Sequence, residues 1–209
     1  MKEDTKAMIL SEARRMFRQN GFSKMRMVDL AKNLNISRGN LSYYFLNKDS
    51  LVRAIWVSYA DAIYRWIDDS SLPFFNDMTR KLYMTMIFDI NIFTDPQICQ
   101  FYYEQMDSEG FKSFFRRISS DFILPLISND SVRFNSDEVD YLLDSLMGSY
   151  RAMDMKFMKD EKRDLDQYIY IKQKIRINMF SAIKPNTFPD LEAAIQVLKE
   201  QDFSGIRCI

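Results

Sequence analysis

Apolar positions recur with the period of an α-helix along almost the whole chain, which predicts an all-helical protein. The first apolar stripe, Ile9, Ala13 and Phe17, ends before Gly21, a residue that can take a left-handed conformation after a helix. Proline, glycine and Asn-Asp positions separate the later stripes. The expected helices are 5–19, two short helices within 21–51, and 48–69, 76–93, 96–106, 111–127, 137–162, 166–183 and 189–201.

The segment 21–51 has the pattern of two short helices joined by a tight turn. Counting from Met27, the small residue Ala31 falls where the helices approach each other, and Asn35 falls at the turn, where a positive φ is tolerated. Ser37 can cap the second helix, because its hydroxyl can accept a backbone N–H from the first turn. The positions expected to pack between the two helices are Leu30, Leu34, Ile36, Leu41 and Tyr44.

The remaining face of the second short helix is polar, basic and aromatic. A packed core requires none of these residues, and they have the chemistry of an element that reads DNA. The residues of this outward face are Arg38, Gly39, Asn40, Ser42 and Tyr43.

The zero net charge of the chain hides a segregation of charge. Residues 1–56 hold eleven Lys and Arg against five Asp and Glu, and the remainder holds 18 against 24. A basic head on an acidic body is typical of a protein with a polyanionic partner. The alternative is that these charges form solvated faces, but the basic excess coincides with the helix-turn-helix pattern.

The composition argues against an enzyme, a metal site and a bound cofactor. The chain has no histidine, which excludes Ser-His-Asp and Cys-His catalysis and histidine metal sites. Its five glycines are scattered, so no phosphate-binding loop is present. Cys99 and Cys208 are far apart, and neither a disulfide framework nor a metal motif is indicated. Without a signal peptide or a long apolar run, we expect a cytoplasmic protein with no membrane partner.

The segment GF…VDLAKNLNISRGNLSYYFLNKDSL, preceded by ILSEARRMFRQNG, resembles the N-terminal domain of the TetR family of bacterial transcriptional regulators. The resemblance covers about a quarter of the chain, and the rest is similar only in helical character and length. It implies a three-helix DNA-binding domain at 1–46 and a larger helical domain at 47–209 for effector binding and dimerisation. The implied function is a sequence-specific transcriptional regulator, most simply a repressor.

A recognition helix of this kind lies in the major groove of double-stranded DNA with its first residues at the base edges. Arg38 can then contact guanine or a phosphate, and Asn40 can contact adenine. Gly39 lets the backbone come close. Tyr43 is expected at a phosphate or a thymine methyl group, and Tyr44 is expected to pack inward with its hydroxyl at the rim. Core packing is the alternative for both tyrosines.

Four further residues complete the expected DNA-binding set. Lys48 lies in the first turn of a helix, where a cation opposes the helix dipole, so we expect a backbone phosphate beside it. The TetR family usually has Thr or Ser at the start of the second helix, and Arg26 is expected to supply the phosphate contact in its place. Ser42 stands where the family often has an aromatic residue, and Ser37 begins the reading helix.

One short reading helix discriminates poorly, so we expect two copies of the chain on a pseudo-palindromic operator. The resemblance implies a homodimer built on a four-helix interface from the last long helices. The same apolar stripes can equally form an intramolecular core. The candidate interface residues are Leu142, Leu143, Leu146, Tyr150, Met153, Phe157, Ile171, Ile175 and Met179.

The middle of the chain is rich in aromatic residues and methionine, which line adaptable apolar pockets. The resemblance implies a pocket here for a small effector, which we expect to be largely apolar or aromatic and to release DNA. An ordinary core is the alternative, and a DNA-binding regulator without a small effector stays open. The candidate effector residues are Phe88, Phe93, Tyr102, Tyr103, Met106, Phe114, Phe115 and Phe122.

Overall fold

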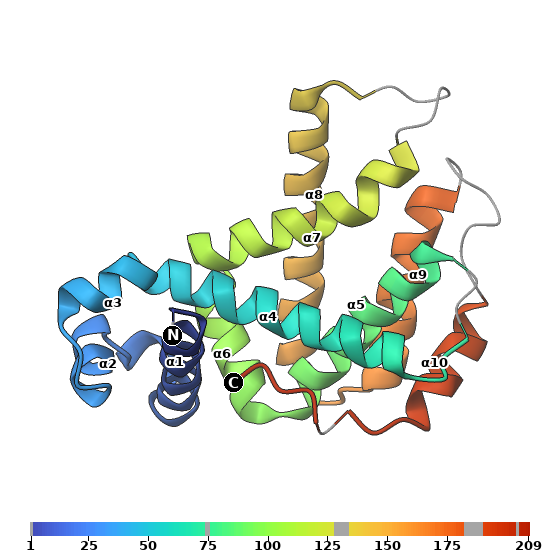
Figure 1. Cartoon of the computed structure of the whole chain (residues 1–209). Helices are drawn as coiled ribbons and strands as arrows, with labels where there is room; N and C mark the ends of the chain where they lie inside the picture. The colour runs from blue at the N-terminus through green and yellow to red at the C-terminus, as the bar shows by residue number, and fades with distance from the viewer. Residues whose placement is uncertain (1, 74–75, 128–133, 182–189, 204) are drawn as a thin grey trace. The chain divides into compact units, whose positions relative to one another are not determined.

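The computed structural model describes residues 2–73, 76–127, 134–181, 190–203 and 205–209. Within these ranges the chain forms helices and no strand (Figure 1), which confirms the all-helical prediction. No helix of this described part is long and apolar enough to cross a membrane. The helices are α1 (Lys2–Lys24), α2 (Met27–Asn33), α3 (Arg38–Tyr44), α4 (Lys48–Asp69), α5 (Asp77–Thr94), α6 (Pro96–Gln105), α7 (Glu109–Ile127), α8 (Ser136–Lys159), α9 (Leu165–Ser181) and α10 (Leu191–Lys199).

Helix starts follow local capping chemistry. Ser37 caps α3 by accepting the Asn40 backbone N–H at 3.1 Å, as predicted. Asn47 caps α4, because its side-chain oxygen accepts the Ser50 N–H at 2.9 Å. The α2 helix begins without a side-chain cap, since Arg26 stands at the capping position. The predicted starts therefore hold where a short polar side chain precedes the helix.

Two residues with positive φ shape the first three helices. Asn35 has φ 53°, which confirms its expected place in the turn between α2 and α3. Gly21 has φ 76° and ψ 166°, so it interrupts α1 three residues before its end. A φ in this range strains side chains that carry a Cβ atom. The positive φ of Gly21 thus confirms the predicted break in the first helix. Its ψ, however, is extended and not that of a left-handed helix.

The chain divides into two compact units. Unit 1 comprises residues 1–62, 91–114 and 206–209, and unit 2 comprises residues 63–90 and 115–205. Three of the four crossings between them fall inside α4, α5 and α7, and the fourth lies between Gly205 and Ile206. Three of the four segments that link the two units covalently are therefore helical.

The core of unit 1 is aromatic and centred on Trp56 of α4. Its ring lies 5.7 Å from Phe101 in a stacked arrangement and 5.4 Å from Phe111 in an edge arrangement. On the α1 side, Phe17 lies 5.0 Å from Phe101. Aromatic pairs at these separations add to the stability that apolar burial provides. This core supports α1, α4 and α6 from within.

Unit 2 has an apolar core and a buried polar cluster. The apolar part joins Met78 with residues of α7 and α8, including Phe122, Leu146 and Tyr150. The polar cluster is centred on Lys172, whose ammonium donates to carboxylates of α5 and α8. Buried ion pairs require close partners, because both charges have left water.

Candidate nucleic-acid interface

The α2–α3 pair is a compact helix-turn-helix within unit 1. Leu30 and Leu41 are fully buried, and Ala31 is buried where the helices meet. The Ile36 N–H donates to the Ala31 carbonyl at 3.0 Å, which closes the turn after Asn35. These contacts confirm the roles expected for the small residue and the turn residue.

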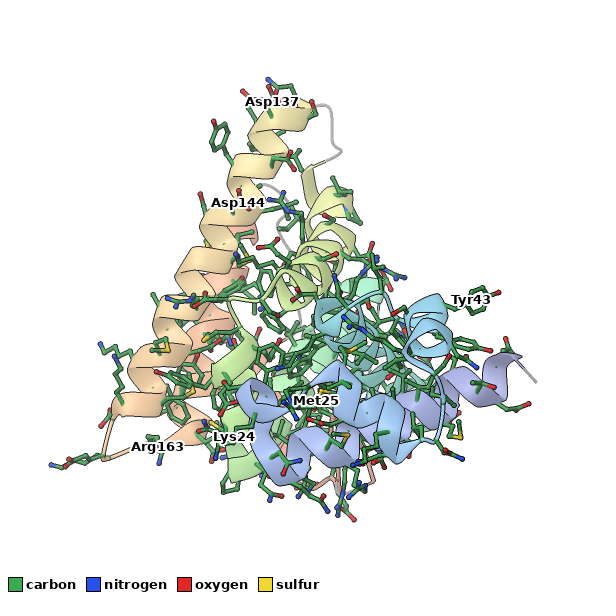
Figure 2. The ribbon with its side chains drawn as sticks, turned by 90° about the vertical axis from the view of Figure 1, so that its left-hand side faces the viewer. Lys24, Met25, Tyr43, Asp137, Asp144 and Arg163 are labelled. Atoms are coloured by element: carbon green, nitrogen blue, oxygen red, sulfur yellow. The ribbon has the colours of Figure 1, made fainter. Side chains whose placement is uncertain are left out.

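The face of α3 that the sequence predicts to point outward is accessible. Arg38, Gly39 and Asn40 are exposed, Ser42 is half-buried, and 67% of the Tyr43 surface is exposed. Figure 2 shows the Tyr43 side chain standing away from the ribbon. Tyr44 is half-buried and meets Tyr43 edge-on at 5.1 Å, in keeping with its expected inward packing.

Gly39 is not required by the local packing. A Cβ atom added at this position would meet only the Ser37 hydroxyl, at 3.9 Å, and glycine costs roughly 0.5–1 kcal/mol relative to alanine inside a helix. The fold therefore gives no reason for glycine at the second position of α3. A glycine at this position would, however, allow another molecule to approach the backbone closely.

Arg26 is already paired within its own turn. Its guanidinium donates to both Asp29 carboxylate oxygens, at 2.7 and 2.9 Å. Both side chains are exposed to solvent, and the pair holds the pKa of Asp29 below its usual value. An exposed pair of this kind contributes little to stability, so a phosphate can compete with Asp29 for Arg26.

Lys48 has an internal partner that the sequence did not reveal. Its ammonium donates to the Phe22 carbonyl and lies 3.9 Å from the centre of the Phe22 ring. Burial lowers the pKa of Lys48, although Glu104 and Asp49 oppose this change. The lysine thus ties the start of α4 to the end of α1, and the phosphate expected beside it stays a prediction.

Glu104 of α6 supports the same junction. Its carboxylate accepts the Ser23 N–H at 2.9 Å and the Gln100 amide at 2.7 Å. Burial opposes ionisation, but these hydrogen bonds outweigh it and hold the pKa of Glu104 below its ordinary value. The sequence does not indicate this role, because the contact joins positions 81 residues apart and no local pattern marks it.

The candidate effector residues fall in both units. Tyr102, Met106 and Phe114 are buried in unit 1, where Tyr102 and Phe114 pack around Trp56. These contacts are those of a core, the alternative that the sequence left open. In the same unit Phe93 is half-buried and Tyr103 is exposed. The three that belong to unit 2 are Phe88, Phe115 and Phe122.

The candidate interface residues divide between a core and a surface. In α8, four of them are buried inside unit 2, so an intramolecular core accounts for them: Leu143, Leu146, Tyr150 and Phe157. Leu142 and Met153 are partly buried beside that core. In α9, Ile171, Ile175 and Met179 are 43%, 38% and 44% exposed. Only the α9 set thus forms an apolar stripe on the surface of the unit.

Residues 9–55, which contain α2 and α3, match the family described as bacterial regulatory proteins, tetR family. The probable HTH-type transcriptional regulator YttP of Bacillus subtilis (strain 168) is 23% identical over 126 residues, 59% of this chain and 60% of the relative. The HTH-type transcriptional regulator UidR of Escherichia coli (strain K12) is 38% identical over 53 residues, 25% of this chain and 27% of the relative. The chain thus spans less than two thirds of either relative.

Two solved structures resemble the chain at low identity. A putative tetR family transcription regulator from Shewanella sp. PV-4 has a TM-score of 0.47 and 12% identity, covering 92% of this chain and 94% of the other. A gamma-butyrolactone receptor (ArpA like protein) has a TM-score of 0.47 and 14% identity, covering 95% and 98%. Likeness at this level adds nothing to the matches of residues 9–55. Residues 9–55, the segment that contains the helix-turn-helix of α2 and α3, are therefore similar to the tetR family of bacterial regulatory proteins.

Proposed function

We propose that the protein is a cytoplasmic, sequence-specific DNA-binding transcriptional regulator. The observation that carries the proposal is the exposed face of α3, which offers Arg38, Gly39, Asn40 and Tyr43 from a capped and internally packed helix. In the major groove, the first turn of α3 faces the base edges and Tyr43 lies at the groove wall. The basic excess of residues 1–56 strengthens attraction to the phosphate backbone.

Selection of bound fragments from the source genome, followed by Arg38→Ala, tests this proposal. We expect wild-type protein to select a pseudo-palindromic site. Arg38→Ala should weaken binding to it by about 1–3 kcal/mol and relax the preference at one base position. The matched control is Arg163→Ala, which removes an exposed arginine of unit 2. Equal behaviour of the two variants would contradict the assignment of α3 as the reading helix.

Lys48→Ala separates a phosphate contact from a structural one. If Lys48 binds a backbone phosphate, the variant should bind all DNA sequences more weakly and lower the slope of log affinity against log salt by about one unit. If Lys48 serves only to hold Phe22, affinity falls and the slope stays as it was. We expect the first result, because one lysine ammonium can donate to both partners. The measurement is a salt titration of operator affinity.

We further propose that the protein acts as a homodimer through α9. The support is its exposed stripe of Ile171, Ile175 and Met179, one turn apart, because contiguous apolar surface marks interaction sites. Ile175→Arg places a charge in the stripe and should shift the protein from dimer to monomer in light scattering. Gln196→Arg, on the exposed side of α10, should leave the dimer intact. A monomeric wild type at micromolar concentration would refute this part.

The regulator is proposed to be a repressor released by a small effector. Two buried atoms of unit 2, Asp89 Oδ2 and Gln173 Nε2, have no hydrogen-bond partner among the residues that the structure describes. Each such atom costs about 1–3 kcal/mol, which an effector with a polar group beside an apolar body would recover. For a near-complete switch it must favour the released arrangement by about 5.5 kcal/mol. Operator release in a ligand screen, compared with Gln173→Leu, is the test.

A further inference from the structure

The last four residues of the chain dock on the DNA-binding unit. Residues 206–209 belong to unit 1, and the end marked C in Figure 1 lies beside α1. Three of these side chains are buried, and Cys208 has no exposed surface. Arg207, between them, is exposed. The segment therefore packs as part of unit 1, although α10, which ends at Lys199, belongs to unit 2.

Two arginines of α1 hold this segment by its backbone. Arg14 Nε donates to the Cys208 carbonyl at 3.0 Å, and Arg18 donates to the Ile209 main-chain oxygen at 3.0 Å. The two arginines are one turn apart on the same face of α1. On α5, the Asn91 amide adds a third anchor by donating to the Ile206 carbonyl at 3.2 Å.

The same arginines connect the docked segment to α4 and α6. Arg14 also donates to the Ser58 hydroxyl of α4. Arg18 also donates to Asp95, the residue that caps α6, at 3.0 Å. Each guanidinium thus joins α1, the terminal segment and one further helix. A guanidinium can do this because it carries several N–H donors that point in different directions.

We propose that residues 206–209 form a regulatory strap that stiffens the DNA-binding unit when docked and lowers operator affinity when released. The strap follows the crossing between Gly205 and Ile206, which is not helical, whereas the other three crossings run inside α4, α5 and α7. A movement in unit 2 can therefore pull on α1 through the bond between Gly205 and Ile206. This inference rests on the proposed DNA binding and adds a regulatory element to it.

Cys208 reports the state of the strap. In a Cys99→Ser background it is the single thiol of the chain. Burial raises the pKa of Cys208, although Arg14 opposes this, so the docked thiol is a poor nucleophile. Labelling by a maleimide then measures opening of the strap.

Arg14→Gln with Arg18→Gln should label at least about tenfold faster than the parent, because each lost hydrogen bond to a charged group favours opening by roughly that factor. Arg15→Gln is the control, since Arg15 is exposed on α1 and its partners among the described residues, Glu12 and Gln19, lie in the same helix. Labelling of the double variant at the parental rate would overturn the docked strap.

Operator affinity of the same proteins tests the coupling. Saturating operator should slow Cys208 labelling of the parent by about tenfold, since coupling is reciprocal. If the double variant labels as fast as a free thiol, its strap is mostly open, and it should bind the operator about tenfold more weakly. Labelling of the parent at the same rate with and without saturating operator would overturn the regulatory role. If no protein binds any DNA, the proposed function fails as well. This outcome can be told apart from failure of the regulatory role alone. In that case the parent still binds the operator and Arg38→Ala binds it weakly.

Discussion

Replacing Lys172 with Met is expected to destabilise the protein by about 3–5 kcal/mol. The ammonium donates to Asp89 at 2.9 Å and to Asp154 at 2.7 Å, and all three side chains are at most 5% exposed. Tyr168 donates to the same Asp154 carboxylate, so the cluster is shared by α5, α8 and α9. Removing the cation takes away the ammonium that donates to both buried carboxylates.

Denaturant unfolding of the variant measures this loss. Lys199→Met is the matched control, because Lys199 pairs with Asp166 at 2.7 Å on the surface, where such pairs contribute at most about 1 kcal/mol. Restoring neutrality by Asp89→Asn with Asp154→Asn in the Lys172→Met protein should recover part of the stability. A loss no larger than that of Lys199→Met would refute the assigned role of the cluster.

The same pair of proteins gives a pH dependence with a definite sign. Burial disfavours the charged ammonium, but Asp154 and Asp89 outweigh it and hold the pKa of Lys172 above its ordinary value. A group with a raised pKa contributes its stability in full below the unfolded value, roughly 10.4 for lysine, and loses it as the pH rises through the folded value. The stability difference between wild type and Lys172→Met should therefore shrink in strong alkali.

Gly110→Ala is expected to disturb the start of α4 and, through it, DNA binding. A Cβ atom at Gly110 would lie 2.3 Å from the Asp49 carbonyl oxygen and 3.0 Å from the Val52 Cβ atom. The Gly110 N–H also donates to the Asp49 carboxylate at 3.2 Å. Because backbone cannot yield as a flexible side chain does, we expect a loss of about 1–3 kcal/mol in stability. Operator affinity should fall with it, since α4 directly follows the reading helix.

Gly148→Ala provides the contrast in stability. An added Cβ atom at Gly148 of α8 would meet no atom within 4 Å. Alanine should then stabilise the helix by roughly 0.5–1 kcal/mol relative to glycine. Thermal unfolding of the two variants, with operator titration of Gly110→Ala, separates close packing from helix propensity. Equal changes in stability would contradict the close contact between Gly110 of α7 and Asp49 of α4.

The sequence predicted those parts of the fold that local chemistry decides. Ser37, Asn35 and Ala31 could be placed because a cap, a turn and a close helix contact each require a residue type within a few positions. The exposed face of α3 could also be predicted, because its apolar positions are expected to pack between the two short helices and the remaining positions must then face outward. The division at residue 46 into functional domains stays a prediction, because the compact units are discontinuous along the chain.

Contacts between distant segments could not be predicted. The phosphate expected beside Lys48 stays a prediction, and its carbonyl and ring partner, Phe22, could not be predicted because it is 26 residues away. Arg14 and Cys208 are 194 residues apart, and no pattern in either segment indicates their hydrogen bond. Apolar periodicity in α8 and α9 also could not tell a core from an interface, because it marks which face is apolar and not what covers it.

Photocrosslinking from position 43 tests the central claim most directly. With p-benzoylphenylalanine in place of Tyr43, the protein bound to its selected operator should crosslink to nucleotides of one half-site, where α3 enters the major groove. The same replacement at Tyr141, which is 76% exposed on α8, should give no crosslink to DNA. A protein that binds the operator but crosslinks from position 141 and not from position 43 would contradict the account.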